Sequence, residues 1–168
     1  MKIGVVGCGG RMGRMLVRQI AATPECRVAG GTGRPGTPAI GKDIGVLAGI
    51  DPLGIAVTED AVPLFADADA VIDFTSPEAT EHHAALAAQG KTVHVIGTTG
   101  LGQAQLAAIG RAARHTAIIQ SPNMSLGVNL LTALVEQVAR TLGPDFDIEI
   151  LEMHHRHKVD APSGTALG

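Results

Sequence analysis

The amino-acid sequence predicts an α/β protein with a Rossmann-like, doubly wound parallel sheet, followed by the start of an α+β domain. Apolar runs of strand length alternate with segments of helical periodicity, the pattern of parallel sheets with right-handed crossovers. A glycine-rich loop joins the first strand to the first helix. Glycine supplies 22 of the 168 residues, whereas Phe supplies 3 and Tyr and Trp none. The backbone must therefore make repeated tight turns or approach something closely.

The first elements form a strand, a glycine loop and a helix. The apolar run 3–6 ends at glycines, and apolar residues then recur at helical spacing until Pro24. A second apolar run, 28–29, ends in the glycine-rich stretch 30–36. The sequence from there to residue 54 is rich in Gly and Pro and predicts a loop, with a short helix as the alternative.

The next buried strand is predicted at 70–74, and Ser76 caps the helix after it, which Gly90 ends. The remaining elements are a strand at 92–96, a helix marked by residues 106–113, a strand at 117–119, a long amphipathic helix at 131–142 and a strand at 147–152. We expect residues 1–125 to form a dinucleotide-binding domain. Residues 126–168 are expected to form the N-terminal part of a second domain.

Composition excludes several classes of function. Thirteen Lys and Arg against 16 Asp and Glu give a formal net charge of -3, which argues against a nucleic-acid partner. The N-terminus lacks a basic leader, and no apolar run is long enough to span a membrane. Cys8 and Cys26 are too far apart for a CxxC pair, and free thiols suit a reducing compartment. We therefore expect a cytoplasmic protein without a membrane or nucleic-acid partner.

The loop after the first strand has the chemistry of a pyrophosphate site. Gly7, Gly10 and Gly13 give the spacing GxxGxxG rather than a strict GxGxxG. Small residues let the backbone approach a pyrophosphate, and a helix N-terminus offers free N–H groups and a positive dipole end. A tight turn without a ligand is the alternative, but the position within a βαβ unit favours dinucleotide binding.

The end of the second strand bears on the choice between NADH and NADPH. Dinucleotide folds usually place an acid there to hold the ribose 2′-OH of NAD. Residues 31–34 contain no acid, and Arg34 is available to pair with a 2′-phosphate. The sequence thus predicts that NADPH is preferred to NADH. A solvated loop charge is the alternative role for Arg34.

Two more loops, 97–100 and 121–124, follow predicted strands. In a parallel sheet both lie at the carboxyl edge, where the nicotinamide half of a cofactor sits. Backbone groups of Thr98, Thr99 and Asn123 are therefore candidate contacts.

The segment 154–158 carries three His, one Arg and one Lys, a local cationic field suited to an anionic substrate such as a dicarboxylate. After it, residues 163–165 are typical of a cap and first helical turn, which can receive a carboxylate through N–H and hydroxyl donors. A His beside a Lys can also donate a proton to a carbanion that forms when hydride arrives.

Two other roles stay open for this basic segment. His154, His155 and His157 could ligate a metal, but only two of them would converge on one face of a strand, so no metal is predicted. A solvated basic loop is the other alternative. His82 and His83 lie on a predicted helix and are expected to be surface or packing residues.

The segments VGCGGRMG, VIDFTSPE, GTTG, SPNMSLGVN and EMHHRHKVDAPSGTALG resemble the 4-hydroxy-tetrahydrodipicolinate reductase (dihydrodipicolinate reductase) family of bacterial lysine biosynthesis. The resemblance spans the whole chain. It implies NAD(P)H-dependent reduction of the cyclic imine derived from 4-hydroxy-tetrahydrodipicolinate to tetrahydrodipicolinate, with loss of water, in the diaminopimelate route.

The resemblance also implies roles for individual residues. His154 matches the proton donor and acceptor of the family, and Lys158 matches a second proton donor. The implied substrate contacts are His155, Lys158, Ser163, Gly164 and Thr165. The implied cofactor contacts are Gly7, Cys8, Gly9, Gly10, Arg11, Met12, Arg34, Gly97, Thr98, Thr99, Ser121, Pro122, Asn123 and Met124. Many members carry an acid just before the arginine, where this chain has Gly33, and this departure weakens the case for NADH.

Members of the family are usually homotetramers and continue beyond the position that matches Gly168. The resemblance thus implies that residues 126–168 are the N-terminal part of a substrate-binding and tetramerisation domain. Two alternatives to an active reductase therefore stay open. One is a non-catalytic NADP-binding fragment of a longer protein. The other is a different amino-acid-pathway dehydrogenase with the same nucleotide half.

Overall fold

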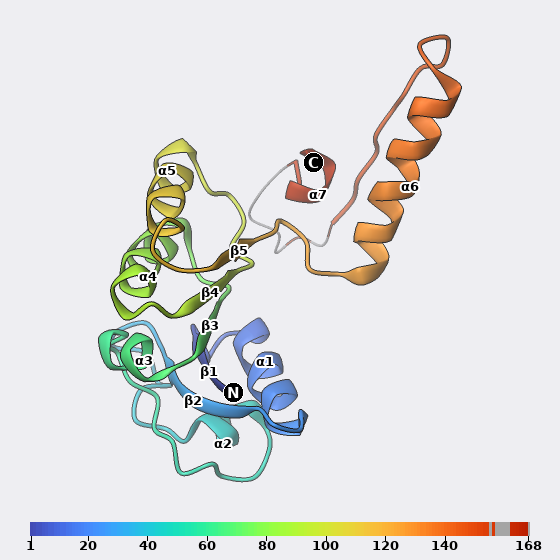
Figure 1. The fold of residues 1–168 in the computed structure, drawn as a ribbon. Helices are drawn as coiled ribbons and strands as arrows, with labels where there is room; N and C mark the ends of the chain where they lie inside the picture. Colours follow the sequence, from blue (N-terminus) through green and yellow to red (C-terminus); the bar gives the residue numbers. More distant parts are fainter. Residues whose placement is uncertain (155, 157–161, 168) are drawn as a thin grey trace. The chain divides into compact units, whose positions relative to one another are not determined.

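The computed structural model describes residues 1–154, 156 and 162–167 (Figure 1). It divides into two compact units, Met1–Gln120 and Ser121–Gly168. Among the described residues, no helix is both long and apolar enough to cross a membrane.

A five-stranded parallel sheet forms the centre of the first unit. Its strands are β1 (Lys2–Val6), β2 (Arg27–Thr32), β3 (Ala70–Asp73), β4 (Val93–Ile96) and β5 (Ile118–Gln120). The order β2-β1-β3-β4-β5 reverses direction between β1 and β3, and this point is where doubly wound sheets bind their ligands. The predicted fold class is confirmed.

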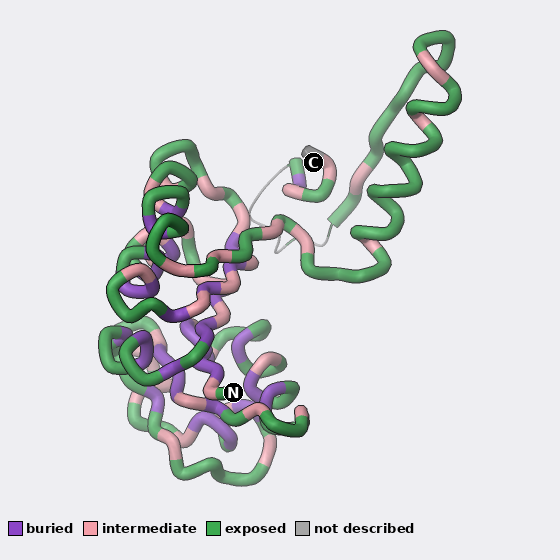
Figure 2. Tube along the Cα trace, in the orientation of Figure 1, coloured by how far each residue is buried: buried purple, intermediate pink, exposed green. Residues whose placement is uncertain are grey.

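Helices cover both faces of the sheet. They are α1 (Arg11–Ala22), α2 (Ile44–Ala48), α3 (Val62–Asp67), α4 (Pro77–Gly90) and α5 (Gln103–Ala112). Successive residues of a strand point to opposite faces, so Val5 packs with Val17 of α1, and Val6 packs with Phe65 of α3. A third cluster joins α4 and α5 to Ile96. In Figure 2 the buried residues gather along the strands and the inner sides of these helices.

The structure corrects the predicted ends of two elements. β2 does not stop at Ala29 but continues through Gly31 to Thr32. A side chain at Gly31 would lie 2.8 Å from Sγ of Cys8, so close packing, rather than a turn, requires this glycine. The helix α4 includes Gly90, and Lys91 takes the left-handed cap conformation with φ of 54°. The sequence also gave no sign of the short helix α3.

The second unit contains α6 (Leu126–Leu142) and α7 (Gly164–Leu167). The strand predicted at 147–152 is wrong, because these residues form no ladder with any described part of the chain. Ile148 and Ile150 are 63% and 69% exposed. Alternation of apolar residues can suit a strand, but a strand also needs a paired edge.

Candidate functional site

The loop between β1 and α1 is shaped by two of its glycines. Gly7 has φ of +70°, and its carbonyl oxygen accepts a 3.0 Å hydrogen bond from the N–H of Gly10. Gly13 lies so close to the loop that a methyl group there would sit 2.6 Å from Cα of Cys8 and closer still to the carbonyl oxygen of Gly7. The Cys8 N–H continues the sheet by donating to the carbonyl of Thr32 at 3.0 Å.

The start of α1 fits a pyrophosphate. Within the fully described stretch 1–22, no side chain caps this helix and its first turn contains no acid. Its first N–H groups therefore lack side-chain partners and carry the positive end of the helix dipole. Arg14 Nε ties the loop down through a 2.9 Å hydrogen bond to the carbonyl of Gly9. The structure thus brings together all the predicted contacts from Gly7 to Met12.

Cys8 lies in this loop with its thiol turned into the protein. Burial raises the pKa of Cys8 to about 11, despite opposing hydrogen bonds from backbone groups. The thiol is therefore protonated at neutral pH and is a poor nucleophile. Cys8 therefore contributes to this loop through its backbone and its packing rather than through thiol chemistry.

Arg34 is exposed in the loop after β2, as its predicted role requires. Its carbonyl oxygen accepts hydrogen bonds from the hydroxyl of Thr37 at 2.8 Å and from the Thr37 N–H at 3.2 Å. The N–H of Gly36 donates to Glu59 Oε1 at 3.0 Å. Glu59 thus brings a carboxylate to the loop, although residues 31–34, at the end of β2, contain no acid. Sequence reasoning missed it because Glu59 reaches the loop through the pairing of Thr58 with Thr32.

A buried polar cluster lies beneath the loops that follow β3 and β4, and we call it the Asp73 cluster. Its members are Asp73, Thr75, Thr80, His83, His94 and Thr98. Asp73, with 0% exposure, accepts hydrogen bonds from the Thr75 hydroxyl at 2.6 Å and the Thr98 hydroxyl at 3.3 Å. The Thr98 hydroxyl also accepts from the Thr80 hydroxyl at 2.8 Å. The side chain of Thr98 is fully engaged, which leaves its backbone as the part available to a cofactor.

Two imidazoles complete the cluster. Nδ1 of His83 lies 2.8 Å and Nε2 of His94 lies 3.3 Å from Oδ2 of Asp73. Burial alone would raise the pKa of Asp73, but hydrogen bonds from His83, His94 and Thr75 and the charge of His83 outweigh it, so this pKa lies well below its usual range. His83 is thus a buried packing residue with a polar partner, whereas His82 beside it is exposed.

In the second unit, the predicted cofactor loop 121–124 contacts the predicted substrate turn 163–165. Asn123 Nδ2 donates to Oγ1 of Thr165 at 2.9 Å. Asn123 Oδ1 accepts from the N–H of Ser125 at 2.8 Å, and the Ser121 hydroxyl donates to the Asn123 carbonyl at 2.7 Å. A side chain at Gly164 would lie 3.1 Å from Cβ of Pro122. These contacts join residues that are 42 positions apart.

Glu152 connects the same turn to His154. Its Oε1 accepts the N–H of Ser163 at 2.9 Å, and its Oε2 contacts Nδ1 of the exposed His154. Oγ of the buried Ser163 accepts from the N–H of Ala166 at 3.3 Å, so the predicted cap is confirmed. No motif in the sequence points to this role of Glu152. The predicted residues His155 and Lys158 and the alternative metal ligand His157 lie outside the described residues.

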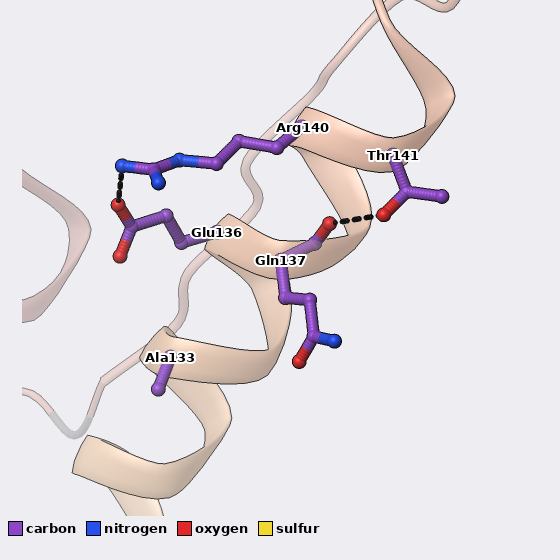
Figure 3. Close-up of a pocket in the computed structure, with 5 residues that line it drawn as sticks. All are labelled: Ala133, Glu136, Gln137, Arg140 and Thr141. Carbon is purple, nitrogen blue, oxygen red and sulfur yellow. Dashed lines mark hydrogen bonds and ion pairs between the residues drawn. The ribbon is translucent and has the colours of Figure 1, made fainter.

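Two other features do not form a candidate site. A shallow hollow of about 230 Å³ lies on α6 (Figure 3). All of its lining residues belong to this one helix: Ala133, Glu136, Gln137, Arg140 and Thr141. Glu136 and Arg140 are paired across one turn, and no predicted site residue lies there. Within the described part of the chain, no group of His, Cys, Asp or Glu is arranged to hold a metal ion.

Comparison with known proteins identifies the family. The family model described as "Dihydrodipicolinate reductase, N-terminus" matches residues 1–124, and "Dihydrodipicolinate reductase, C-terminus" matches residues 127–168. The chain belongs to the dihydrodipicolinate reductase family.

Individual members of this family agree with that assignment. The 4-hydroxy-tetrahydrodipicolinate reductase of Methylocella silvestris is 59% identical over 167 residues, which are 99% of this chain and 61% of that protein. The same-named protein of Brucella abortus is 57% identical over 168 residues, 99% of this chain and 63% of that protein. The chain thus spans about three fifths of the length of these relatives.

Solved structures show the same fold. A dipicolinate-bound dihydrodipicolinate reductase from Paenisporosarcina sp. TG-14 matches with a TM-score of 0.72 and 26% identity, over 99% of this chain and 63% of that one. An aspartate semialdehyde dehydrogenase with NADP from Candida albicans matches with a TM-score of 0.57 and 14% identity, over 85% of this chain and 48% of that one. The second likeness concerns the fold alone.

Proposed function

We propose that the chain forms the cofactor-binding part and the opening of the substrate-binding part of a 4-hydroxy-tetrahydrodipicolinate reductase. The reaction is the NAD(P)H-dependent reduction of 4-hydroxy-tetrahydrodipicolinate, through dihydrodipicolinate, to tetrahydrodipicolinate in the diaminopimelate route of lysine biosynthesis. The observation that carries this proposal is family membership over both units, with 59% identity to a reductase of that name.

The cofactor is held first by the β1–α1 loop. Backbone N–H groups between Gly7 and Met12 bind the pyrophosphate, and the uncapped start of α1 stabilises its charge. Arg34 pairs with a 2′-phosphate, which makes NADPH the preferred cofactor. Backbone groups of residues 97–99 and 121–124 hold the nicotinamide half. When bound, the nicotinamide supplies the hydride.

Residues of the second unit bind the dicarboxylate substrate and supply the proton. Gly164 and Thr165, with His155 and Lys158, hold the carboxylates. Ser163 acts by shaping the turn, because its N–H and its hydroxyl oxygen already have partners in the chain. Nδ1 of His154 faces Glu152, which leaves Nε2 as the ring atom that can pass a proton to the substrate. Lys158 is the second proton donor.

We further propose that the full-length protein works in the cytoplasm as a homotetramer with no nucleic-acid or membrane partner. The net charge of -3 supports the absence of nucleic acid. Size-exclusion chromatography with light scattering on the full-length protein tests the tetramer, and a monomer or dimer would contradict it.

The activity is tested by following NADPH oxidation at 340 nm with enzymatically generated substrate. We expect His154→Ala to lower kcat by about 10²-fold or more, the usual contribution of a general acid, with the Kd for NADPH unchanged. His82→Ala, an exposed imidazole on α4, is the matched control. An unchanged kcat in the His154 variant would refute the assignment.

A further inference from the structure

Asp73 ends β3 at the carboxyl edge of the sheet, and it lies beneath two loops at once. The loop after β3 is held through Thr75, whose N–H and hydroxyl both donate to Oδ1, at 2.9 and 2.6 Å. The loop after β4 is held through the Thr98 hydroxyl, 3.3 Å from the same oxygen. The two loops are also joined directly, because the Thr75 N–H donates to the Thr98 hydroxyl at 3.1 Å. One carboxylate oxygen therefore fixes both loops.

The other carboxylate oxygen, Oδ2, faces His83 and His94. An ionised carboxylate only accepts hydrogen bonds, so both imidazoles present an N–H to it. The remaining nitrogen of His94, Nδ1, is buried and has no hydrogen-bond partner among the described residues. Donors of the cluster therefore engage both oxygens of Asp73.

The stability of the core alone does not explain why a carboxylate is buried at this position. A buried charge is costly, and an apolar residue of similar volume would often fill such a place at least as well. Asp73 instead accepts hydrogen bonds from the loops after β3 and β4, next to the point where the strand order reverses. Residues 97–99, which follow β4, are those assigned to the nicotinamide half of the cofactor.

We propose that Asp73 is a positioning residue that fixes the loops 74–76 and 97–99 in the geometry that receives the nicotinamide. It acts through Thr75 and Thr98, and Thr80 on α4 supports Thr98 from the helix side. The identity of the ligand in this inference rests on the proposed function. The effect on the loops themselves can be measured without any ligand.

The test compares two ligands in the 168-residue chain, NADPH and 2′,5′-ADP, which lacks the nicotinamide half. We expect Asp73→Asn to weaken NADPH binding at least tenfold in calorimetry and to leave the affinity for 2′,5′-ADP within twofold. The amide keeps one acceptor oxygen and places an NH2 group where the other oxygen accepted hydrogen bonds, so either the loop donors or the imidazoles lose their acceptor and the anchor weakens. His82→Gln, an exposed imidazole on the same helix as His83, should change neither affinity.

A second pair of variants, with smaller changes in structure, tests the proposal if Asp73→Asn does not fold. Thr80→Val removes the hydroxyl that donates to Thr98, whereas Thr80→Ser keeps it. We expect the valine variant to weaken NADPH binding threefold or more and the serine variant to bind as the parent chain does. Equal affinities in the two variants would overturn the proposal.

Hydrogen exchange without ligand separates this inference from the proposed function. Amides of residues 97–99 should exchange at least tenfold faster in Asp73→Asn or, if that variant does not fold, in Thr80→Val. If the parent chain fails to bind NADPH, the proposed function fails, while faster exchange in these loops still supports the role of Asp73 in positioning them. Unchanged loop exchange, or an equal loss of affinity for both ligands, would overturn the inference.

Discussion

Replacing Gly13 with Ala should damage the chain, although alanine favours helices. In an open helical position the change gains up to about 1 kcal/mol of helix propensity. At Gly13 the new methyl would lie 2.6 Å from Cα of Cys8, well inside van der Waals contact. Overpacking of this kind costs about 1–3 kcal/mol, and backbone atoms cannot rotate away as a side chain can. At the full gain in propensity, we expect a net loss of up to about 2 kcal/mol in the free energy of unfolding.

Gly110 in α5 provides the matched control, because a methyl there would meet no atom within 4 Å. Gly110→Ala should raise the free energy of unfolding by up to about 1 kcal/mol. Because both variants share the gain in helix propensity, they should differ by the overpacking cost, about 1–3 kcal/mol. Urea unfolding followed by far-UV circular dichroism suits a chain without Trp or Tyr. Gly13→Ala should also weaken NADPH binding, since the loop must shift. If the two variants were equally stable, the close approach of α1 to the loop would not be what requires glycine.

Three further predictions concern charge and reactivity. The pKa of Asp73 is lower in the folded chain than its unfolded value of about 3.9, so Asp73 stabilises the fold at neutral pH and this stability is lost as the pH falls below about 4. Urea unfolding at a series of pH values should show this loss, and Asp73→Asn should flatten it. Cys26 should react with a thiol reagent much faster than Cys8, whose thiol is buried and has a pKa raised to about 11; equal rates in the native protein would contradict that burial. Arg34→Ala should weaken NADPH binding about tenfold, the loss of roughly one charge-assisted contact, and leave NADH binding unchanged. A similar loss for both cofactors would show that Arg34 does not recognise the 2′-phosphate.

The sheet could be predicted well from the sequence because each central strand is a short apolar run that ends at a turn signal. The failures have physical causes. The glycine-rich pattern predicts a turn at Gly31, yet the missing side chain of this glycine makes room for Cys8 within the sheet. The alternation at 147–152 resembles a strand, but no described segment pairs with it. A local sequence pattern shows which structures a segment can adopt, whereas strand pairing and side-chain packing determine which one it adopts.

The candidate site divides in the same way. The loop at Gly7 and the turn at Ser163 are local motifs, and both could be located from spacing alone. The Asp73 cluster could not, because its members come from β3, α4, β4 and the loops between them. A weak signal was present all the same: an acid ends the apolar run of β3, and His94 interrupts the apolar run of β4. Polar residues inside predicted buried strands need hydrogen-bond partners, but the sequence alone does not show which residues these partners are.

The hydrogen bond between Glu59 and Gly36 bears on how cofactor use is classified and engineered. A common rule judges the choice between NADH and NADPH from the residue at the end of the second strand. In this chain a window of that kind contains only Gly33 and Arg34, while a carboxylate arrives from more than twenty positions downstream. We expect the proposed preference for NADPH to depend on both segments. A redesign that alters the arginine should therefore vary the distant acid as well.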